Sequence, residues 1–384
     1  MNKRSKYADS QISSLGVSCY TERIKHIHSA CFDARWSGTH HAVVRFRRQQ
    51  LFPERDKTMH PLRHTTLLSA LGVALCLMAP RVGQAQQRQF TIIDVPGAPN
   101  TVVTGLNNKG QLVGSYDNGT VTKSFVWSNG KFTDLAAPSS VLISNANGIN
   151  DKGQIVGLQV SDTFTQGGFF YDHGSFTQFD NPNAVFGLTF PHAINKSGQV
   201  AGFFVGADFN TSGFIYQRGV FKTVKVPFTG AITTAINAIN DDSQIAGYYN
   251  ASFPDGSFVT KAFITVKGKF TALNVPNATV FSVATGINKQ GQVVGYYQGF
   301  DSSTHGFLYD NGHYTLIDAP GTGIQNTYPG GINDKGQISG EYVDSNSVIH
   351  GFLLSDSKNS GHGHGGDDGD DDDDDDNDCH DHGD

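Results

Sequence analysis

The aspartate side chains of this chain recur at intervals that could support binding chemistry. One lies a few residues after each of six glycines that close a repeated motif, at offsets from 3 to 8 residues. A ring of carboxylates on one face of a fold could bind cations or sugar hydroxyls. The varying offsets favour ordinary Asx turns, in which each carboxylate caps its own loop. The six residues are Asp117, Asp162, Asp208, Asp255, Asp301 and Asp344.

Asparagine and glutamine also recur once in each repeat, four residues apart. Chemistry needs one asymmetric site, whereas a side chain repeated sixfold meets a structural need of every repeat. We therefore predict a turn cap and a buried hydrogen-bond latch rather than a catalytic role. His305 and His350 occupy equivalent positions in neighbouring repeats, and we expect hydrogen bonding inside the repeat rather than metal ligation. The repeated pairs begin at Asn107, Asn150, Asn195, Asn240, Asn288 and Asn333 and end at Gln111, Gln154, Gln199, Gln244, Gln292 and Gln337.

The repeated asparagines and glutamines belong to a decapeptide motif that occurs six times in the chain, and the motif determines their positions. Its clearest copy is Gly-Ile-Asn-Asp-Lys-Gly-Gln-Ile-Ser-Gly at 331–340. A second block that starts at a phenylalanine follows each copy, and it is clearest at 307–320, where it ends in proline. The phenylalanine-to-proline offset is 13 residues in the five complete copies, and insertions fall only in the joins between blocks. A period in the forties indicates a solenoid, a propeller or an array of modules.

Each block reads as a β-hairpin. In the decapeptide, Asn at the first turn position and Gly at the fourth suit a type I turn with a left-handed glycine. Ser243 takes that place in the fourth copy, so we expect its turn to be strained or differently shaped. Asn311-Gly312 predicts the tight turn of the second hairpin, with Tyr309 and Tyr314 meeting across its strands. The glycine that closes each decapeptide indicates close approach between strands.

The two ends of the array complement each other. The stretch around Phe90 is the end of a second block without its beginning, and the stretch around Phe352 is a beginning without its end. We therefore predict an all-β fold over 86–355, a six-bladed β-propeller of four-stranded antiparallel blades. Pairing of the N- and C-terminal strands would close its last blade. An open β-solenoid is the alternative, although no capping repeat is visible in the sequence.

The motif pair resembles the HAF repeats of predicted secreted bacterial proteins. The likeness covers residues 90–354 and rests on the recurring Gly-Ile-Asn-x-x-Gly-Gln-Ile-x-Gly units followed by His-Gly-Phe-Leu-Tyr. Lys123-Ser124 and Lys261-Ala262 depart from the usual His-Gly or His-Ala before the phenylalanine. The resemblance implies an extracellular, propeller-like protein, and it brings no assigned activity and no functional residues.

Charge divides the chain into unlike segments. Residues 1–85 carry 13 Lys/Arg against 5 Asp/Glu, whereas residues 86–360 carry 15 against 18, which argues against nucleic acid as a partner. Residues 59–85 have the basic and apolar regions of a signal peptide, and the apolar run is too short to span a membrane. We expect a misassigned, disordered upstream segment at 1–58, secretion to the periplasm or the exterior, and no membrane span after cleavage.

Residues 356–384 form a tail rich in Gly, His and Asp that we expect to be disordered. Three cysteines precede residue 86, so the mature chain would retain only Cys379 and form no intrachain disulfide. We expect no cofactor, although the tail could bind Ca²⁺ or transition metals weakly. The candidate ligands are Asp370, Asp371, Asp372, His380 and His382.

The variable joins are the expected location of function. Tight turns should all lie at one end of the blades and joins at the other, and binding residues concentrate in variable loops. We expect a monomeric, non-catalytic binding or structural module for an extracellular glycan or protein, with exposed aromatic residues of the joins as contacts. The alternative is a polysaccharide hydrolase or lyase that uses the same end. The candidate binding residues are Tyr248, Tyr249, Phe253, Asp255, Asp301 and Asp208.

Overall fold

The computed structural model describes residues 88–321, 323–324 and 326–356. This part of the chain is all β, with 24 strands and one short 3₁₀ turn, η1 (Val185–Gly187). The predicted boundaries at residues 58 and 85 and the tail lie outside the described residues.

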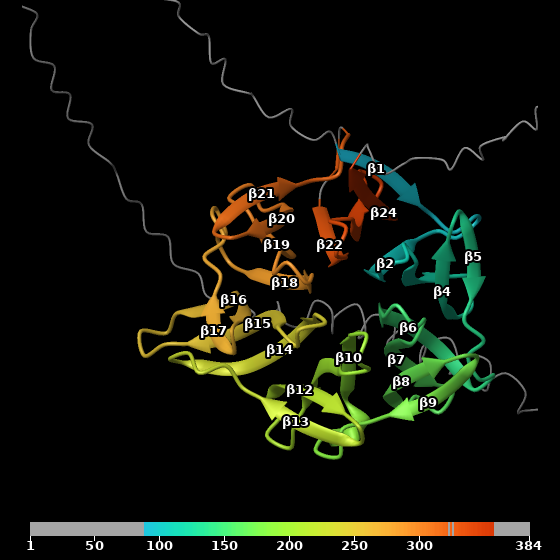
Figure 1. The fold of residues 1–384 in the computed structure, drawn as a ribbon, viewed down its shortest axis with the longest axis horizontal. Helices are drawn as coiled ribbons and strands as arrows, with labels where there is room; N and C mark the ends of the chain where they lie inside the picture. Colours follow the sequence, from blue (N-terminus) through green and yellow to red (C-terminus); the bar gives the residue numbers. More distant parts are fainter. Residues whose placement is uncertain (1–87, 322, 325, 357–384) are drawn as a thin grey trace, which may run out of the picture. The chain divides into compact units, whose positions relative to one another are not determined.

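The strands follow one another in antiparallel sets of four, which we call units and number along the chain (Figure 1). Unit 1 comprises β2 (Thr101–Leu106), β3 (Leu112–Asp117), β4 (Thr122–Ser128) and β5 (Lys131–Asp134). Unit 2 comprises β6 (Val141–Ile149), β7 (Ile155–Ser161), β8 (Gln166–Asp172) and β9 (Ser175–Phe179). Unit 3 comprises β10 (Thr189–Ile194), β11 (Val200–Val205), β12 (Thr211–Gln217) and β13 (Val220–Val224).

The remaining strands continue the pattern. Unit 4 comprises β14 (Ala231–Ile239), β15 (Ile245–Ser252), β16 (Phe258–Val266) and β17 (Lys269–Ala272). Unit 5 comprises β18 (Ser282–Ile287), β19 (Val293–Gln298), β20 (Thr304–Asp310) and β21 (His313–Ile317). Unit 6 comprises β22 (Asn326–Ile332), β23 (Ile338–Val343), β24 (Ile349–Asp356) and, from the start of the chain, β1 (Arg88–Ile93). Single parallel pairings join units 1 and 2, and units 5 and 6, into eight-stranded sheets.

Strand β1 lies antiparallel to β24, with Phe90 opposite Leu354 and Ile92 opposite Phe352. The rings of Phe90 and Phe352 lie 5.0 Å apart. The predicted pairing of the first and last described strands is therefore present. Figure 1 shows the innermost strands β2, β6, β10, β14, β18 and β22 around a common centre, and each contacts the next.

The core of each unit combines a phenylalanine from the third strand with a glycine from the second. These six phenylalanines are almost completely buried, and a side chain at the paired glycine would collide with a backbone carbonyl of the first strand. The prediction that the closing glycine marks crowded strands is confirmed. The phenylalanines are Phe125, Phe169, Phe214, Phe263, Phe307 and Phe352, and the glycines are Gly114, Gly157, Gly202, Gly247, Gly295 and Gly340.

The turn of the decapeptide has one shape in all six units. In unit 5 the N–H of Gly291 donates to the carbonyl of Asn288, and in unit 4 Ser243 makes the same bond to Asn240 at 3.0 Å. Ser243 has a φ of 60°, so the fourth copy keeps the turn and accepts backbone strain. In the second hairpin of unit 5, Tyr309 and Tyr314 pair across the strands as predicted, with ring centroids 5.1 Å apart.

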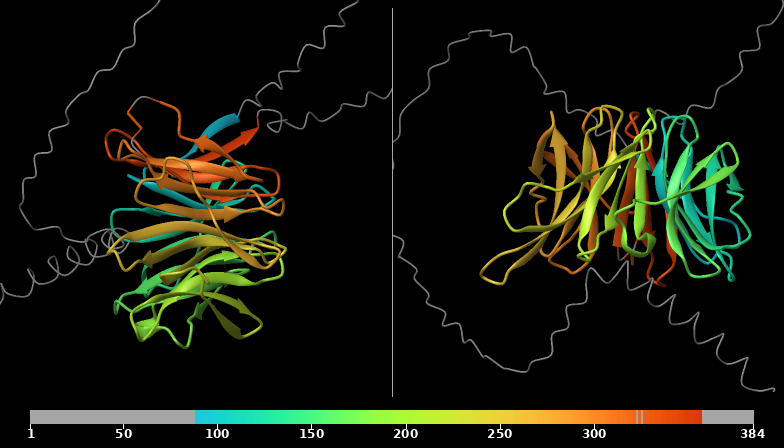
Figure 2. Two further views of the ribbon diagram at one scale, coloured as in Figure 1. Left: turned by 90° about the vertical axis from the view of Figure 1, so that its left-hand side faces the viewer. Right: turned by 90° about the horizontal axis from the view of Figure 1, so that it is seen from below.

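Because consecutive strands are antiparallel, the connections alternate between two ends of the units (Figure 2). We call one the turn end, made of the tight turns 107–111, 129–130, 150–154, 173–174, 195–199, 218–219, 240–244, 267–268, 288–292, 311–312 and 333–337. We call the other the join end. Its joins within units are 118–121, 162–165, 206–210, 253–257, 299–303 and 344–348, and those between units are 94–100, 135–140, 180–188, 225–230, 273–281 and 318–325.

Candidate functional site

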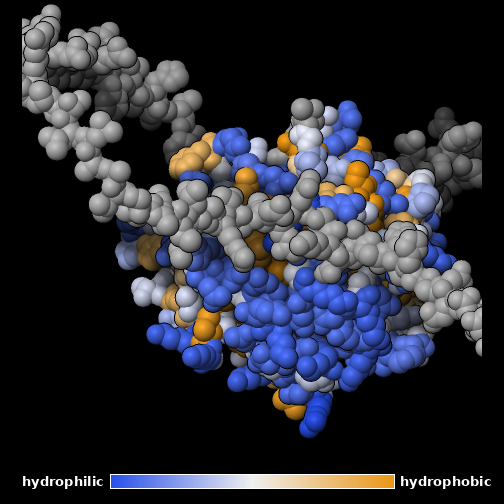
Figure 3. Space-filling view, turned by 45° about the horizontal axis from the view of Figure 1, so that its top comes forward, coloured by the Kyte–Doolittle hydropathy of each residue, from blue (hydrophilic) through white to orange (hydrophobic). Residues whose placement is uncertain are grey.

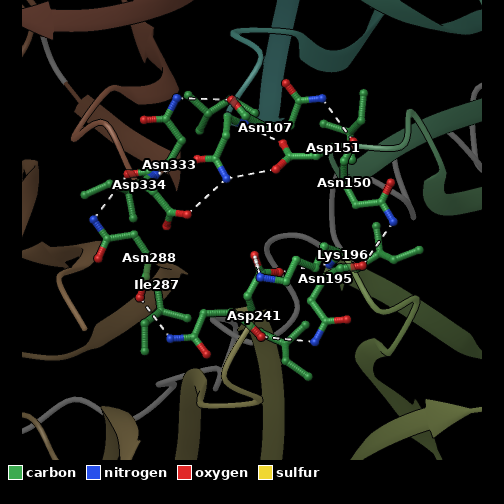
Figure 4. Close-up of a pocket in the computed structure, with 17 residues that line it drawn as sticks. Asn107, Asn150, Asp151, Asn195, Lys196, Asp241, Ile287, Asn288, Asn333 and Asp334 are labelled. Atoms are coloured by element: carbon green, nitrogen blue, oxygen red, sulfur yellow. Dashed lines mark hydrogen bonds and ion pairs between the residues drawn. The ribbon is translucent and has the colours of Figure 1, made fainter. Parts of the chain in front are cut away.

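A polar pocket lies at the turn end, where the decapeptides of all six units meet (Figure 4). Its cavity volume of about 80 Å³ is sufficient for a few water molecules or a small ion. An aliphatic residue and the repeated asparagine of every decapeptide line it, and in all units except unit 5 the residue that follows the asparagine does so too. The pocket is therefore a direct product of the repeat.

The asparagines around this pocket form a closed series of hydrogen bonds. Each side-chain Nδ2 donates to the backbone carbonyl of the equivalent asparagine in the next unit at 2.9–3.2 Å, and Asn333 donates to Asn107. Each Nδ2 also donates to the repeated glutamine of its own unit, and each Oδ1 accepts backbone N–H groups of its own turn, as Asn333 does from Lys335 and Gln337. The predicted turn cap and latch are confirmed.

The charged residues that follow these asparagines are also engaged between units. Asp151 accepts the backbone N–H of Asn108 at 2.8 Å, and Asp334 accepts that of Lys289 at 2.8 Å. Asp241 accepts the N–H of Lys196 and forms an ion pair with its Nζ at 3.3 Å. We interpret the pocket as a structural hub, because its polar groups bind neighbouring units.

The aspartates of the repeated ring cap their own loops. In five of the six, one carboxylate oxygen accepts the backbone N–H two residues later, at 2.7–3.1 Å, which confirms the Asx turns. The side-chain hydrogen bond from Asn210 lowers the pKa of Asp208, and that from Ser257 lowers the pKa of Asp255. These carboxylates are exposed and remain ionised at neutral pH.

His305 and His350 lie at the join end between pairs of carboxylates. His305 Nδ1 contacts Asp318 at 2.8 Å and its Nε2 contacts Asp301 at 3.2 Å, while His350 Nδ1 contacts Asp94 at 2.7 Å. Burial lowers the pKa of His305, but the hydrogen bonds and charges of Asp318 and Asp301 outweigh it, so the pKa is raised. The predicted hydrogen-bonding role is confirmed. Among the described residues, no group of three or more His, Cys, Asp or Glu has the geometry to hold a metal ion.

Glu341 is a partly buried acid in β23, on the face that also carries Ser339. Its Oε2 and the Ser339 Oγ are enclosed and have no hydrogen-bond partner among the described residues. Burial raises the pKa of Glu341 to about 7. The other five units have Ser115, Leu158, Phe203, Tyr248 and Tyr296 at this position, so Glu341 is its only acid.

The residues predicted to bind a ligand have different surroundings. Tyr249 is buried and packs on Phe228, with ring centroids 4.7 Å apart, so its ring lies in the core of unit 4 rather than at the expected surface. Phe253 is partly buried against the same core, and Tyr248 lies within β15. The exposed candidates are the loop aspartates Asp208, Asp255 and Asp301, each in a different unit. That these residues bind a ligand stays a prediction.

Exposed hydrophobic side chains gather at the join end. Of the eleven large hydrophobic residues exposed in the described part of the chain, nine lie in a join or within two residues of one. Much of the surface seen in Figure 3 is hydrophilic, so this concentration is informative. Sequence reasoning expected aromatic contacts here but named Tyr248, Tyr249 and Phe253, none of which belongs to this group. The nine are Ile92, Phe164, Phe186, Phe209, Ile232, Phe258, Val280, Phe300 and Leu316.

The signal that could have identified these residues is their place in the loops. Phe209 directly follows Asp208 and has a φ of 57°, where the corresponding residues of units 4 and 5 are Gly256 and Ser302. A phenylalanine costs more than glycine in this left-handed conformation. Phe209 is 72% exposed, so burial does not explain its presence.

The predicted signal peptide, the cysteines and the tail ligands Asp370, Asp371, Asp372, His380 and His382 lie outside the described residues. Within those residues, no helix has the length and apolar character required to cross a membrane.

Neither a protein family model nor a curated protein matches this chain. Solved structures show a distant likeness. AofleA from Arthrobotrys oligospora is 13% identical, with 69% of this chain and 86% of that chain covered and a TM-score of 0.42. A gluconolactonase from Xanthomonas campestris is 13% identical, with 67% and 86% covered and a TM-score of 0.42. The six-bladed Aleuria aurantia lectin is 11% identical, with 66% and 91% covered and a TM-score of 0.39. At these scores the likeness carries no argument about activity or ligand.

Proposed function

We propose that this chain is a closed six-bladed β-propeller that acts outside the cytoplasm as a monomeric, non-catalytic binding module. The six units are its blades, and β1 completes the last one. Support comes from the pairing of β1 with β24 and from the inter-unit hydrogen bonds, which return from Asn333 to Asn107. The HAF-like repeats and the signal-like segment at 59–85 motivate the location.

The ligand docks at the join end and is an extracellular glycan or protein. The observation that carries this proposal is the concentration of exposed hydrophobic side chains there, led by Phe300 and Phe186 at 83% and 80% exposure. Apolar side chains clustered at one end of a polar surface are typical of interaction sites. The turn end is less suitable, because the polar groups of its pocket already bind neighbouring units.

The test is a screen of the full chain against immobilised glycans and extracellular proteins. The variant Phe209→Ser/Phe300→Ser should lose the binding that the wild type shows. Val220 and Val266 are also exposed but lie beside the tight turns 218–219 and 267–268, at the opposite end, so Val220→Ser/Val266→Ser is the matched control. Equal loss in both variants would reject the join end as the binding surface.

The enzyme alternative is tested in the same preparation. A polysaccharide panel that is turned over by the wild type and not by Asp255→Ala or Asp301→Ala would show catalysis at the join end. That result would reject the non-catalytic role.

A further inference from the structure

The exposed phenylalanines of the join end are accompanied by carboxylates. Four of the six joins within units carry an aspartate and an exposed phenylalanine no more than three residues apart. The other two joins have no phenylalanine, although Asp344 lies in one and Asp117 is the last strand residue before the other, so the hairpin itself does not require the aromatic ring. The pairs are Asp162 with Phe164, Asp208 with Phe209, Asp255 with Phe258, and Asp301 with Phe300.

The two ends of the units also differ in charge. The described residues of the joins include eight aspartates and one basic residue, Lys225. The tight turns include four aspartates and seven basic residues, and three of those aspartates bind the neighbouring unit. The join end is therefore the acidic end. Its aspartates are Asp94, Asp162, Asp180, Asp208, Asp255, Asp301, Asp318 and Asp344.

Among the described residues, two histidines contact these carboxylates. His305 lies between Asp301 and Asp318, and His350 lies beside Asp94. The carboxylates of Asp208 and Asp255 instead accept hydrogen bonds from their own loops, from Asn210 and Ser257. Lys225, in the join between units 3 and 4, adds one positive charge near Asp208.

A carboxylate beside an exposed aromatic ring matches an alkylammonium or guanidinium group. The carboxylate attracts the positive charge, and the ring face receives it through a cation–π contact. A neutral glycan also stacks on aromatic rings, but it gains nothing from a surplus of negative charge. Charge of one sign on a binding face selects and steers a partner of the opposite sign.

From this juxtaposition we propose that the join end binds a lysine- or arginine-rich segment of another protein, received by the Asp–Phe pairs. This inference rests on the proposed function and specifies its partner class. The cationic side chains lie against Phe209 and Phe300, and Asp208 and Asp255 provide the counter-charge.

The test measures binding of an oligolysine peptide to the immobilised full chain. The variant Asp162→Asn/Asp208→Asn/Asp255→Asn removes three charges from the join end, and asparagine can still cap the loops of Asp208 and Asp255. The control variant Asp172→Asn/Asp242→Asn/Asp310→Asn removes three charges beside the tight turns. The aspartate-rich tail is present in both variants, so its contribution to binding cancels in the comparison.

The join-end triple variant should bind oligolysine at least about tenfold more weakly than the control triple variant. Phe209→Ser/Phe300→Ser should weaken binding about fivefold to tenfold without any change in net charge, because two cation–π contacts are lost. Equal weakening by both triple variants would overturn the inference, since it would indicate attraction to net charge alone.

The outcomes separate this inference from the proposed function. One outcome is that a neutral glycan binds and loses affinity in Phe209→Ser/Phe300→Ser, while neither this variant nor the join-end triple variant changes the affinity for oligolysine. The join end is then a binding surface, and the inference of a cationic partner is wrong. If the join-end substitutions change the affinity for neither oligolysine nor any glycan or protein that binds, both the cationic partner and the proposed binding function at the join end are rejected.

Discussion

Replacement of Glu341 by glutamine should stabilise the protein at neutral and alkaline pH and leave it nearly unchanged in acid. The carboxyl group has a pKa of about 7 in the folded protein, against 4.5 for the ordinary side chain. A raised pKa of an acid means that the folded state binds the proton more tightly than the unfolded state. Stability therefore falls as the pH rises from about 4.5 to about 7, and it is constant above that range.

The magnitude follows from this shift. Each pKa unit corresponds to about 1.4 kcal/mol, so the difference between 7 and 4.5 sets an upper limit of about 3 kcal/mol for the loss in the wild type. Glutamine has the same shape and never ionises, so Glu341→Gln should recover about 1 to 3 kcal/mol at about pH 8. Glu341→Leu introduces leucine, the residue that unit 2 has at the equivalent position 158, and it removes both carboxyl oxygens of Glu341.

The assay is urea denaturation followed by circular dichroism, with the full-length wild type and both variants, at several pH values from about 4 to about 8. Only the difference between variant and wild type is interpreted, because other groups titrate in the same range. A difference that does not change with pH would refute the reasoning that Glu341 is a partly buried acid without a partner.

Three further predictions test other parts of the structure. Asn333→Ala removes one hydrogen bond from unit 6 to unit 1 and three within the turn of unit 6. The free energy of unfolding in urea should therefore fall by about 3 to 4 kcal/mol, and a fall below about 1 kcal/mol would reject the latch. His305→Gln should lower the melting temperature more below about pH 6.5 than above about pH 8. The raised pKa of His305 means that its protonated form stabilises the fold in acid, and this stabilisation is lost as the pH rises through that pKa. Equal effects of the substitution at both pH values would contradict this prediction. Phe209→Gly should leave the free energy of unfolding unchanged or raise it by about 0.5 kcal/mol, because the relieved strain slightly exceeds the entropy cost of glycine. Destabilisation by Phe209→Gly would instead show that the ring contributes to packing.

Much of the fold follows from positions that recur. The asparagine, glutamine and glycine of each decapeptide have the same backbone task in every unit, so the sequence predicted the turn cap, the latch and the crowded strands. The all-β propeller-type architecture follows from the same spacing. Ser243 shows that the shared hydrogen bonds decide the shape of its turn despite an unfavourable φ.

The candidate site was harder to predict because its residues do not recur in every unit. Tyr248 and Tyr249 are adjacent in a strand covered on both faces, so hydrophobicity alone could not show that Tyr249 lies in the core. From the sequence alone, Phe209 cannot be distinguished from the phenylalanines of the core, because only the structure shows its loop conformation and its exposure. Glu341 lies at a position that holds no acid in the other five units, and only the structure shows that its Oε2 is enclosed.

The most direct test of the account is amide hydrogen exchange of strand β1 in the full chain. The two ends and their functions depend on closure of unit 6 by β1, whose residues pair with β24 in a continuous register. The account predicts that the amides of β1 exchange as slowly as those of the other outermost strands, β5, β9, β13, β17 and β21. Exchange of β1 at the rate of an unstructured peptide, while those strands remain protected, would contradict it.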